Sequence, residues 1–222
     1  MKRILSLLII FLPWSIKRFI LIKIWNFEIH PSSRIGLSYI YPSKLRMHQN
    51  SKIGSFNVAI NLDEVVLKKN SSISRFNWIT GFSTKKKTKH FSHQKGRSSK
   101  LLLGQDSAIT KYHHLDCTSV ISVGKFSIIA GYQSQFLTHS INLHSNRQHS
   151  EPIIIGDYCF VGTNCVILGG SQLPNNSVLG AKSLLNKSFE NEYTLYGGVP
   201  AADVSKIPKE SKFFTRKEGF VY

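Results

Sequence analysis

The sequence predicts an all-β fold, a parallel β-helix, and two regularities over residues 155–185 predict it. An aliphatic residue recurs at every sixth position without a miss, at Ile155, Val161, Ile167, Leu173, Leu179 and Leu185. A small residue follows each of the first five by four positions, at Cys159, Cys165, Ser171, Ser177 and Ser183. A period of six fits neither the 3.6-residue repeat of a helix nor the alternation of a plain strand. It fits short strands joined by tight corners, with each aliphatic side chain stacked on its counterpart one coil later.

The small residues have a physical reason, because two bulky side chains at each corner would overfill a narrow coil. Cys159 and Cys165 occupy these small inward positions. We therefore expect them to be buried packing residues of a protein in a reducing compartment. Cys117 is a single thiol and by itself makes no metal site.

The charge of the chain is concentrated in two stretches. A length of 222 residues and a hydrophobic share of 41% fit one domain with end pieces. Of the formal net charge of +17, residues 1–26 contribute five cations and no acid, and residues 83–100 contribute seven and no acid. The rest of the chain carries only about +5.

Residues 1–29 are expected to form a helical segment at a membrane interface. The apolar run from Ile4 to Ile16 is shorter than the roughly 20 residues that span a bilayer, and no small-residue cleavage site follows it. A longer span would bury Lys17, Arg18 and Lys23 at high cost. We expect the segment to lie on an anionic inner leaflet. The alternative is a helix that packs against the end of the β-helix or against a neighbouring subunit.

The six-residue rhythm begins after His30 and predicts a β-helix domain over residues 30–203, followed by a cap over residues 204–222. Two segments interrupt it: a basic loop at 83–100 and a second break at 132–152. The basic loop is either a solvated excursion or a contact with something anionic, namely cofactor phosphates, an acidic glycan or lipid headgroups. Nucleic acid is not expected, because Phe91 is the loop's one aromatic residue and no nucleic-acid-binding motif accompanies it.

Three motifs resemble a known family: Ile155-Gly156-Asp157 continuing to Gly162, Leu179-Gly180-Ala181, and Gly198-Val199-Pro200-Ala201. They resemble the hexapeptide-repeat acyltransferases, most closely those of polysaccharide, capsule and O-antigen pathways, over His30 to Pro208. The resemblance implies a left-handed coil with about three hexapeptides per turn. It also implies a homotrimer with active sites between subunits.

In this family a catalytic histidine precedes the last uninterrupted coils, a place that Thr138-His139 occupies here. The resemblance implies that His139 is the general base that deprotonates the acceptor as it attacks a thioester. Asp116 is the acid expected to orient the imidazole, and Glu151 is the other option. Asn142, Arg147 and Gln148 are candidates for holding acceptor hydroxyls.

The resemblance also implies acetyl-CoA as co-substrate, in a groove between two subunits, and no metal. The pantetheine would be flanked by Thr163 and Ala181. The nucleotide phosphates would lie near Lys182, Lys187 and Lys206, since lysine suits phosphates as a mobile charge. Two positions depart from the family's pattern, because Phe160 stands where many relatives have Trp and Asn186 where Thr-Lys is usual.

The expected function is therefore transfer of an acetyl group from acetyl-CoA to a hydroxyl of a sugar in a surface polysaccharide or its precursor. The protein would be cytoplasmic and peripheral on the inner face of the cytoplasmic membrane. Two alternatives stay open. One is a carbonic-anhydrase-like zinc enzyme that uses His139, His144 and His149, spaced five residues apart. The other is a non-catalytic solenoid that binds glycan.

Overall fold

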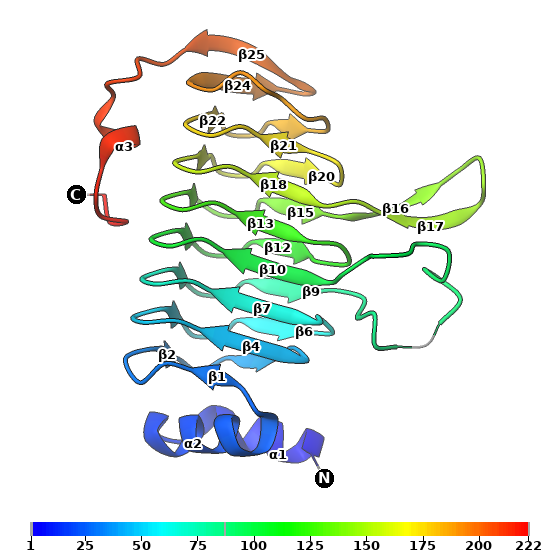
Figure 1. Ribbon diagram of the computed structural model, residues 1–222, viewed down its shortest axis with the longest axis vertical. Helices are drawn as coiled ribbons and strands as arrows, with labels where there is room; N and C mark the ends of the chain where they lie inside the picture. Colours follow the sequence, from blue (N-terminus) through cyan, green and yellow to red (C-terminus); the bar gives the residue numbers. More distant parts are fainter. Residues whose placement is uncertain (1, 87, 222) are drawn as a thin grey trace.

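The chain winds into a tall stack of coils that carries helices at one end (Figure 1). In the computed structural model, which describes residues 2–86 and 88–221, three sheets of seven, nine and seven strands run the length of the stack, and all neighbouring strands are parallel except the last pair of the nine-stranded sheet. We call them sheets A, B and C, and the chain visits them in that order in each coil. The parallel β-helix predicted from the sequence is confirmed.

The strands are short and are distributed over the sheets as follows. Sheet A contains β1 (Glu28–Ile29), β4 (Lys44–Met47), β7 (Glu64–Leu67), β10 (Lys100–Leu103), β13 (Ile121–Val123), β18 (Ile153–Ile155) and β21 (Gln172–Leu173). Sheet B contains β2 (Arg34–Ile35), β5 (Lys52–Ile53), β8 (Ser72–Ile73), β11 (Ala108–Ile109), β14 (Ile128–Ile129), β19 (Phe160–Val161), β22 (Val178–Leu179), β24 (Thr194–Gly198) and β25 (Ala201–Lys206). Sheet C contains β3 (Tyr39–Tyr41), β6 (Val58–Ile60), β9 (Trp78–Thr80), β12 (His114–Asp116), β15 (Gln135–Leu137), β20 (Val166–Leu168) and β23 (Leu184–Leu185).

The core is the column of inward side chains that the repeat predicts. All six aliphatic residues of the 155–185 run are buried, and so are the five small residues that accompany them. Cys117, Cys159 and Cys165 are free thiols with no exposed surface, and burial raises the pKa of each of them. Because a buried thiol stays protonated and out of reach, these cysteines act as packing residues.

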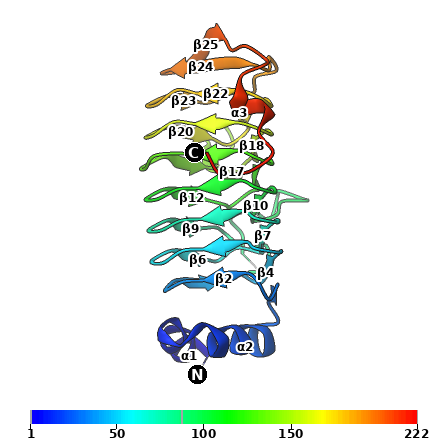
Figure 2. The same cartoon turned by 90° about the vertical axis from the view of Figure 1, so that its left-hand side faces the viewer.

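Two helices close the first coil, where α1 (Lys2–Leu8), a 3₁₀ turn (Ile9–Phe11) and α2 (Trp14–Trp25) lie across its open end (Figures 1 and 2). Leu21 joins the core of the coil from α2. Lys17 is also buried, and its Nζ donates a hydrogen bond of 2.6 Å to the carbonyl oxygen of Gly36. The inner face of the segment thus packs on the β-helix, as the alternative interpretation expected. Among the residues that the structure describes, the helices fall short of the length and hydrophobicity of a membrane span.

Two excursions leave the stack at the corner between sheets C and A, at the right of Figure 1. The first is the basic loop between β9 and β10, of which Lys87 lies outside the described residues. The second is an antiparallel hairpin of β16 (His139–Asn142) and β17 (Arg147–Ser150), between β15 and β18. The sequence-based break at 132–152 was too wide, because β15 is a regular strand. Its inward residue is Phe136, which a search for aliphatic residues overlooks.

The last coil ends in an antiparallel pair, β24 and β25, so the predicted domain boundary at residue 203 falls inside β25. The tail then returns along the outside of the stack through α3 (Lys212–Thr215) (Figure 2). There the Arg216 guanidinium lies 5.9 Å from the centre of the Phe126 ring and 5.7 Å from that of Tyr158, two residues of the coil. These cation–π contacts hold the tail on the corner between sheets A and B.

Candidate active site

The β16–β17 hairpin is fixed to the coil at the residue before His139. Thr138 is buried, and its hydroxyl donates a hydrogen bond of 2.7 Å to the backbone oxygen of Asp116 in the coil below. The same hydroxyl accepts a hydrogen bond of 2.8 Å from the backbone N–H of Ser119. Because both of its partners belong to the rigid coil, Thr138 defines where the chain leaves sheet C. His139 therefore begins the hairpin from a fixed point.

The imidazole of His139 lies between Asp116 and Gln148. Its Nδ1 is 3.7 Å from Oδ2 of Asp116, and its Nε2 contacts Oε1 of Gln148 across the hairpin. The other carboxylate oxygen of Asp116 accepts hydrogen bonds of 2.6 and 3.0 Å from the hydroxyl and backbone N–H of Thr118. A carboxylate held in this way favours the tautomer with the proton on Nδ1, which leaves Nε2 free to accept a proton. With the proton on Nδ1, Nε2 can only accept a hydrogen bond, so this tautomer requires the Gln148 amide to turn from its Oε1 contact and present its NH₂ group.

Three residues of the basic loop complete the surroundings of His139, and sequence analysis did not select any of them for this role. The ring of Phe91 is buried and meets the His139 ring edge-on, with centres 5.4 Å apart. The Arg97 guanidinium lies 4.4 Å from the centre of the Phe91 ring and donates to the backbone oxygen of Thr118 at 2.6 Å. The side chain of Gln94 donates to the Ser150 carbonyl at 3.0 Å. The loop is thus docked on the hairpin here, so the interpretation as a solvated excursion is wrong for this part of it.

A narrow cleft of about 210 Å³ opens beside His139 along the C–A corner. Its lining residues are Leu137, Thr138, His139, Ser140, His149, Glu151, Leu168, Gly169 and Asn186. Glu151, the second acid considered for orienting His139, lies instead 3.4 Å from Nε2 of His149. Asn186, one of the two departures from the family's pattern, thus stands at the upper end of the cleft.

The residues expected to bind the cofactor do not gather around His139 within one chain. Thr163 and Ala181 lie on the corner between sheets B and C, one coil apart. Lys182 follows at the same corner. These positions are at the opposite edge of sheet C from His139, so they could complete a site with it only across two protomers.

The two remaining candidate lysines lie near the last coils. The ammonium of Lys187 lies 5.1 Å from the centre of the Phe189 ring, and that of Lys206 donates to the Thr194 hydroxyl at 2.9 Å. Phe160, the other departure, packs edge-on against Phe213 of the returning tail. Its ring therefore contributes to holding the tail.

The candidate acceptor-binding residues lie on the hairpin. Asn142 pairs with Arg147 in the β16–β17 ladder, and its side-chain oxygen caps the turn by accepting from the Ser145 backbone N–H at 3.0 Å. Gln148 is directed to His139.

The three histidines of the zinc alternative do not converge, and no group of three or more His, Cys, Asp or Glu side chains that could hold a metal occurs in residues 2–86 and 88–221.

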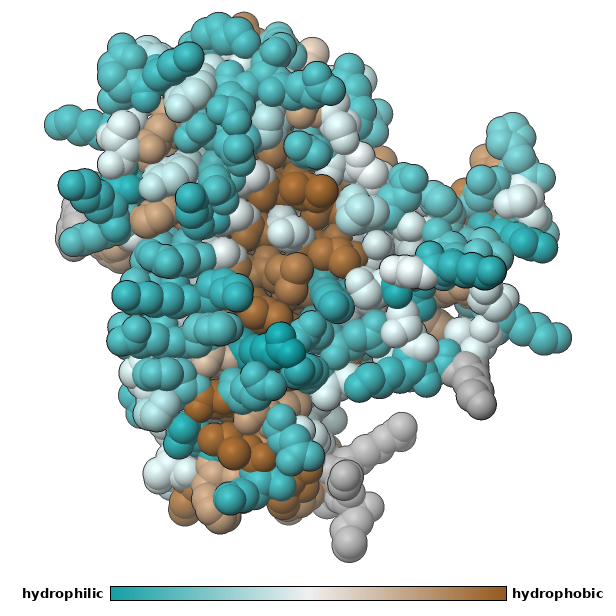
Figure 3. Space-filling model, viewed as in Figure 1, coloured by the Kyte–Doolittle hydropathy of each residue, from teal (hydrophilic) through white to brown (hydrophobic). Residues whose placement is uncertain are grey.

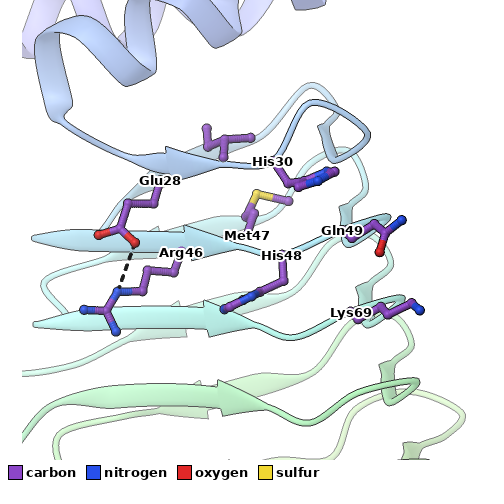
Figure 4. Close-up of a pocket in the computed structure, with 8 residues that line it drawn as sticks. Glu28, His30, Arg46, Met47, His48, Gln49 and Lys69 are labelled. Carbon is purple, nitrogen blue, oxygen red and sulfur yellow. Dashed lines mark ion pairs between the residues drawn. The ribbon is translucent and has the colours of Figure 1, made fainter.

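A larger cavity of about 560 Å³ lies at the other end of the stack, over β1 and β4 (Figure 4). Its one acid, Glu28, is 3.4 Å from Arg46 and 3.6 Å from Lys44. These opposite charges neutralise one another at the surface. The cavity is remote from His139. One of its two histidines, His30, accepts a hydrogen bond of 3.2 Å at Nδ1 from the Ser32 backbone N–H, and within the described residues it forms no ion pair with an acid.

Comparison with known proteins gives relatives of one kind. No family model matches the chain. A protein of Escherichia coli strain K12 named as a lipopolysaccharide biosynthesis O-acetyl transferase, WbbJ, is 26% identical over 125 residues, which cover 49% of this chain and 61% of that protein. The chain therefore matches less than two thirds of this curated relative's length.

Solved structures agree on the architecture. AntD, an N-acyltransferase from Bacillus cereus solved with dTDP-4-amino-4,6-dideoxyglucose and coenzyme A, has a TM-score of 0.59 at 16% identity and covers 78% of this chain and 84% of its own. The polysialic acid O-acetyltransferase OatWY has a TM-score of 0.58 at 19% identity and covers 81% and 84%. The resemblance noted in the sequence is confirmed: part of the chain is similar to an O-acetyl transferase, and the chain shares its parallel β-helix fold with two solved acyltransferases.

Proposed function

We propose that the protein transfers an acetyl group from acetyl-CoA to a hydroxyl group of a sugar in a surface polysaccharide or its precursor. The observation that carries this proposal is the Asp116–His139 pair, with Nδ1 of the imidazole 3.7 Å from the carboxylate and Nε2 on the side of the hairpin. The relatives support the two substrates, because one is named for O-acetyl transfer in lipopolysaccharide biosynthesis and another was solved with a nucleotide-linked sugar and coenzyme A.

The reaction needs one base and two bound substrates. Nε2 of His139 takes the proton of the acceptor hydroxyl while its oxygen attacks the thioester carbonyl carbon. The tetrahedral intermediate then collapses, the C–S bond breaks, and the imidazolium returns the proton to the departing thiolate of coenzyme A. Asp116 stabilises the imidazolium and acts as a positioning residue. Because the thioester is already activated, holding the two substrates together supplies much of the rate.

We further propose a homotrimer in which each site lies between two protomers. Along the B–C corner the rings of Phe56, Phe76 and Tyr112 are stacked with centres 4.9 and 4.8 Å apart, and all three are exposed. On the A–B corner, the stacked rings of Phe126 and Tyr158 are covered by Arg216 of the tail. Figure 3 shows a second uncovered apolar area on sheet A, where Leu102 and Ile154 lie in register on either side of Ser122.

Cyclic trimers need two different, complementary patches of this kind. Contact between the B–C corner of one protomer and sheet A of the next would bring Thr163 and Ala181 toward His139 of the neighbour. Light scattering tests this assembly. A monomer at working concentration would refute it.

The outer face of the N-terminal helices supports the proposed contact with an anionic membrane. Phe11 and Phe19 are 77% and 62% exposed there, and residues 1–27 contain no acid. Apolar side chains beside Lys23 fit an interfacial helix on anionic lipid. Phe11→Ser with Phe19→Ser should abolish co-sedimentation with phosphatidylglycerol vesicles, and equal binding of the variant would refute the contact.

The function is tested with a histidine substitution and a matched control on the same hairpin. His139→Gln should reduce thiol release from acetyl-CoA in the presence of acceptor by about 10²- to 10⁴-fold, the usual contribution of a general base. His144→Gln, at the exposed turn of the hairpin, should leave the rate unchanged. Mass spectrometry of surface glycan from cells expressing each variant identifies the acceptor, because only the His139 variant should lack the acetyl group. An active His139→Gln protein would overturn the proposal.

A further inference from the structure

A cavity of about 450 Å³ lies between the basic loop and the β16–β17 hairpin, outside the cleft already described. It is lined by Lys89, His90, Ser92, His93, Ile141, Asn146, Arg147 and Gln148. Four of these come from the loop and four from the hairpin, so the cavity exists only because the two excursions meet. Neither residues 83–100 nor residues 139–150 contain an acid.

Both walls of the cavity are held in place. At the base of the loop, Asp63 accepts hydrogen bonds from Ser83 (2.6 Å), from the hydroxyl and backbone N–H of Thr84 (2.8 and 2.9 Å), and from the Ser99 backbone N–H (3.0 Å). One carboxylate thus joins the two ends of the loop. At the hairpin, Gln94 exchanges hydrogen bonds of 3.0 and 2.9 Å with the backbone oxygen and hydroxyl of Ser150. The loop therefore presents Lys89 to the cavity from a defined position.

The positive charge in the cavity is not neutralised by the protein. Within the described ranges, neither Lys89 nor Arg147 lies within 4.0 Å of a carboxylate oxygen. On sheet A, by contrast, a cationic side chain is paired with acids: Arg46 lies 3.4 Å from Glu28 and 3.4 Å from Glu64. Two cations that face one cavity without a counter-charge create a local field that attracts anions.

The cavity is connected to His139 through one residue. Gln148 lines the cavity and also contacts Nε2 of His139, the nitrogen assigned to proton transfer. Phe91 fills the space behind this contact, where its ring meets that of His139. A molecule whose charged group lies between Lys89 and Arg147 would therefore have its remaining part beside the imidazole.

We infer that this cavity binds the anionic group, a carboxylate or a phosphate, of an acidic sugar acceptor. The inference rests on the proposed function, whose acceptor class it narrows. The planar guanidinium of Arg147 matches the paired oxygens of either group, and Lys89 adds a mobile point charge. The basic loop is thus the wall that selects a charged acceptor over a neutral one.

Binding of small probes to the full-length protein tests the inference by calorimetry. The probes are a glucuronic acid oligosaccharide, a neutral glucose oligosaccharide of equal length, glucose 1-phosphate and coenzyme A. The test variant is Lys89→Ser with Arg147→Gln. Its control is Lys85→Ser with Lys95→Ser, which removes the same charge from exposed positions of the loop that do not line the cavity.

The wild-type protein should bind a charged sugar more tightly than the neutral one, and added salt should weaken that binding. The test variant should weaken it by about tenfold or more, as expected for loss of charged hydrogen bonds. Coenzyme A binding should be unchanged, as should all binding by the control, and any loss of neutral sugar binding should be smaller than the loss of charged sugar binding. The carboxylated and phosphorylated probes distinguish the two sources of the anionic group.

Three results would overturn the inference: no preference for either charged sugar, an equal loss in the control variant, or a loss confined to coenzyme A. The last of these would make the cavity a cofactor phosphate site. The test is independent of catalysis, because His139→Gln retains both walls of the cavity. An active His139→Gln protein that still prefers charged sugars would refute the proposed base and leave the binding site in place.

Discussion

Replacing Phe91 by alanine should release the basic loop from the hairpin while the β-helix stays folded. Phe91 is 6% exposed, and its ring contacts His139, Arg97 and Phe82. Truncating a buried phenylalanine costs about 3–5 kcal/mol, which includes roughly 0.5–1.5 kcal/mol for each ring contact. These contacts hold the loop and not the coil. The lost free energy should therefore make the loop open more often, while the β-helix stays folded.

The lower end of that range, about 3 kcal/mol, corresponds to an increase of about 10² in the population of the open loop. Hydrogen exchange measured by mass spectrometry should therefore accelerate to that extent in peptides from the loop and the hairpin. Peptides from 153–185 should be unaffected and provide the internal reference. Phe91→Leu, which keeps most of the apolar volume and loses the ring, should accelerate exchange by only about tenfold.

Unchanged exchange in the loop of Phe91→Ala would show that the ring does not hold it, and the reasoning would fail. Faster exchange across 153–185 would show that the loop and the coil unfold together, which would also refute it. If local opening is found, binding of the charged sugar should decrease while coenzyme A binding is retained.

Two further predictions concern charged groups. Burial lowers the pKa of Lys17 to about 8 in the folded protein, whereas an unperturbed lysine has a pKa of about 10.4. Between about pH 8 and pH 10.4, Lys17 therefore binds a proton in the unfolded chain and not in the folded protein. Stability measured by urea unfolding should therefore rise with pH through this window, and Lys17→Met should remove the rise. A parallel slope in both proteins would contradict this. Burial raises the pKa of Asp63, but its hydrogen bonds outweigh burial and hold the pKa below its ordinary value. Its contribution is present above about pH 3.9 and is lost as pH falls through the lower folded pKa. Asp63→Asn should open the loop by about 1–3 kcal/mol at neutral pH, seen as faster exchange of its amides. An unaltered loop would show that the carboxylate is not its anchor.

The coil could be predicted from the sequence because its rule is local. Each inward position needs an aliphatic residue and a small partner, and the 155–185 run satisfies both at every step. The rule failed where another residue type fills the same space. Phe136 is an inward residue of β15, where the break from 132 to 152 was predicted. A narrow core accepts such exchanges when neighbouring positions are smaller, and periodicity alone cannot detect them.

The candidate site could be predicted only in part, for a related reason. Asp116 ends β12, and His139 lies two residues beyond the end of β15, the hydrogen-bonded neighbour of β12, so the expected acid does lie beside the imidazole. The contact of Phe91 with His139 depends on a loop without repeats, whose path no period constrains. The signal in the sequence was a single aromatic residue in an otherwise polar, basic stretch, which is weak evidence without the fold.

The position of the two excursions explains why the basic loop belongs to the site. The loop leaves after β9 and the hairpin after β15, and these strands are separated only by β12 in sheet C. Neighbouring strands are about 4.8 Å apart, so the two departure points lie only about 10 Å apart along the stack. A long basic loop leaving at that height cannot avoid the hairpin, and an insertion of the same composition at either other corner would point to another side of the stack. The choice of corner therefore places the positive charge beside His139, and a copy of the loop moved to the A–B corner should fail to restore binding of a charged acceptor.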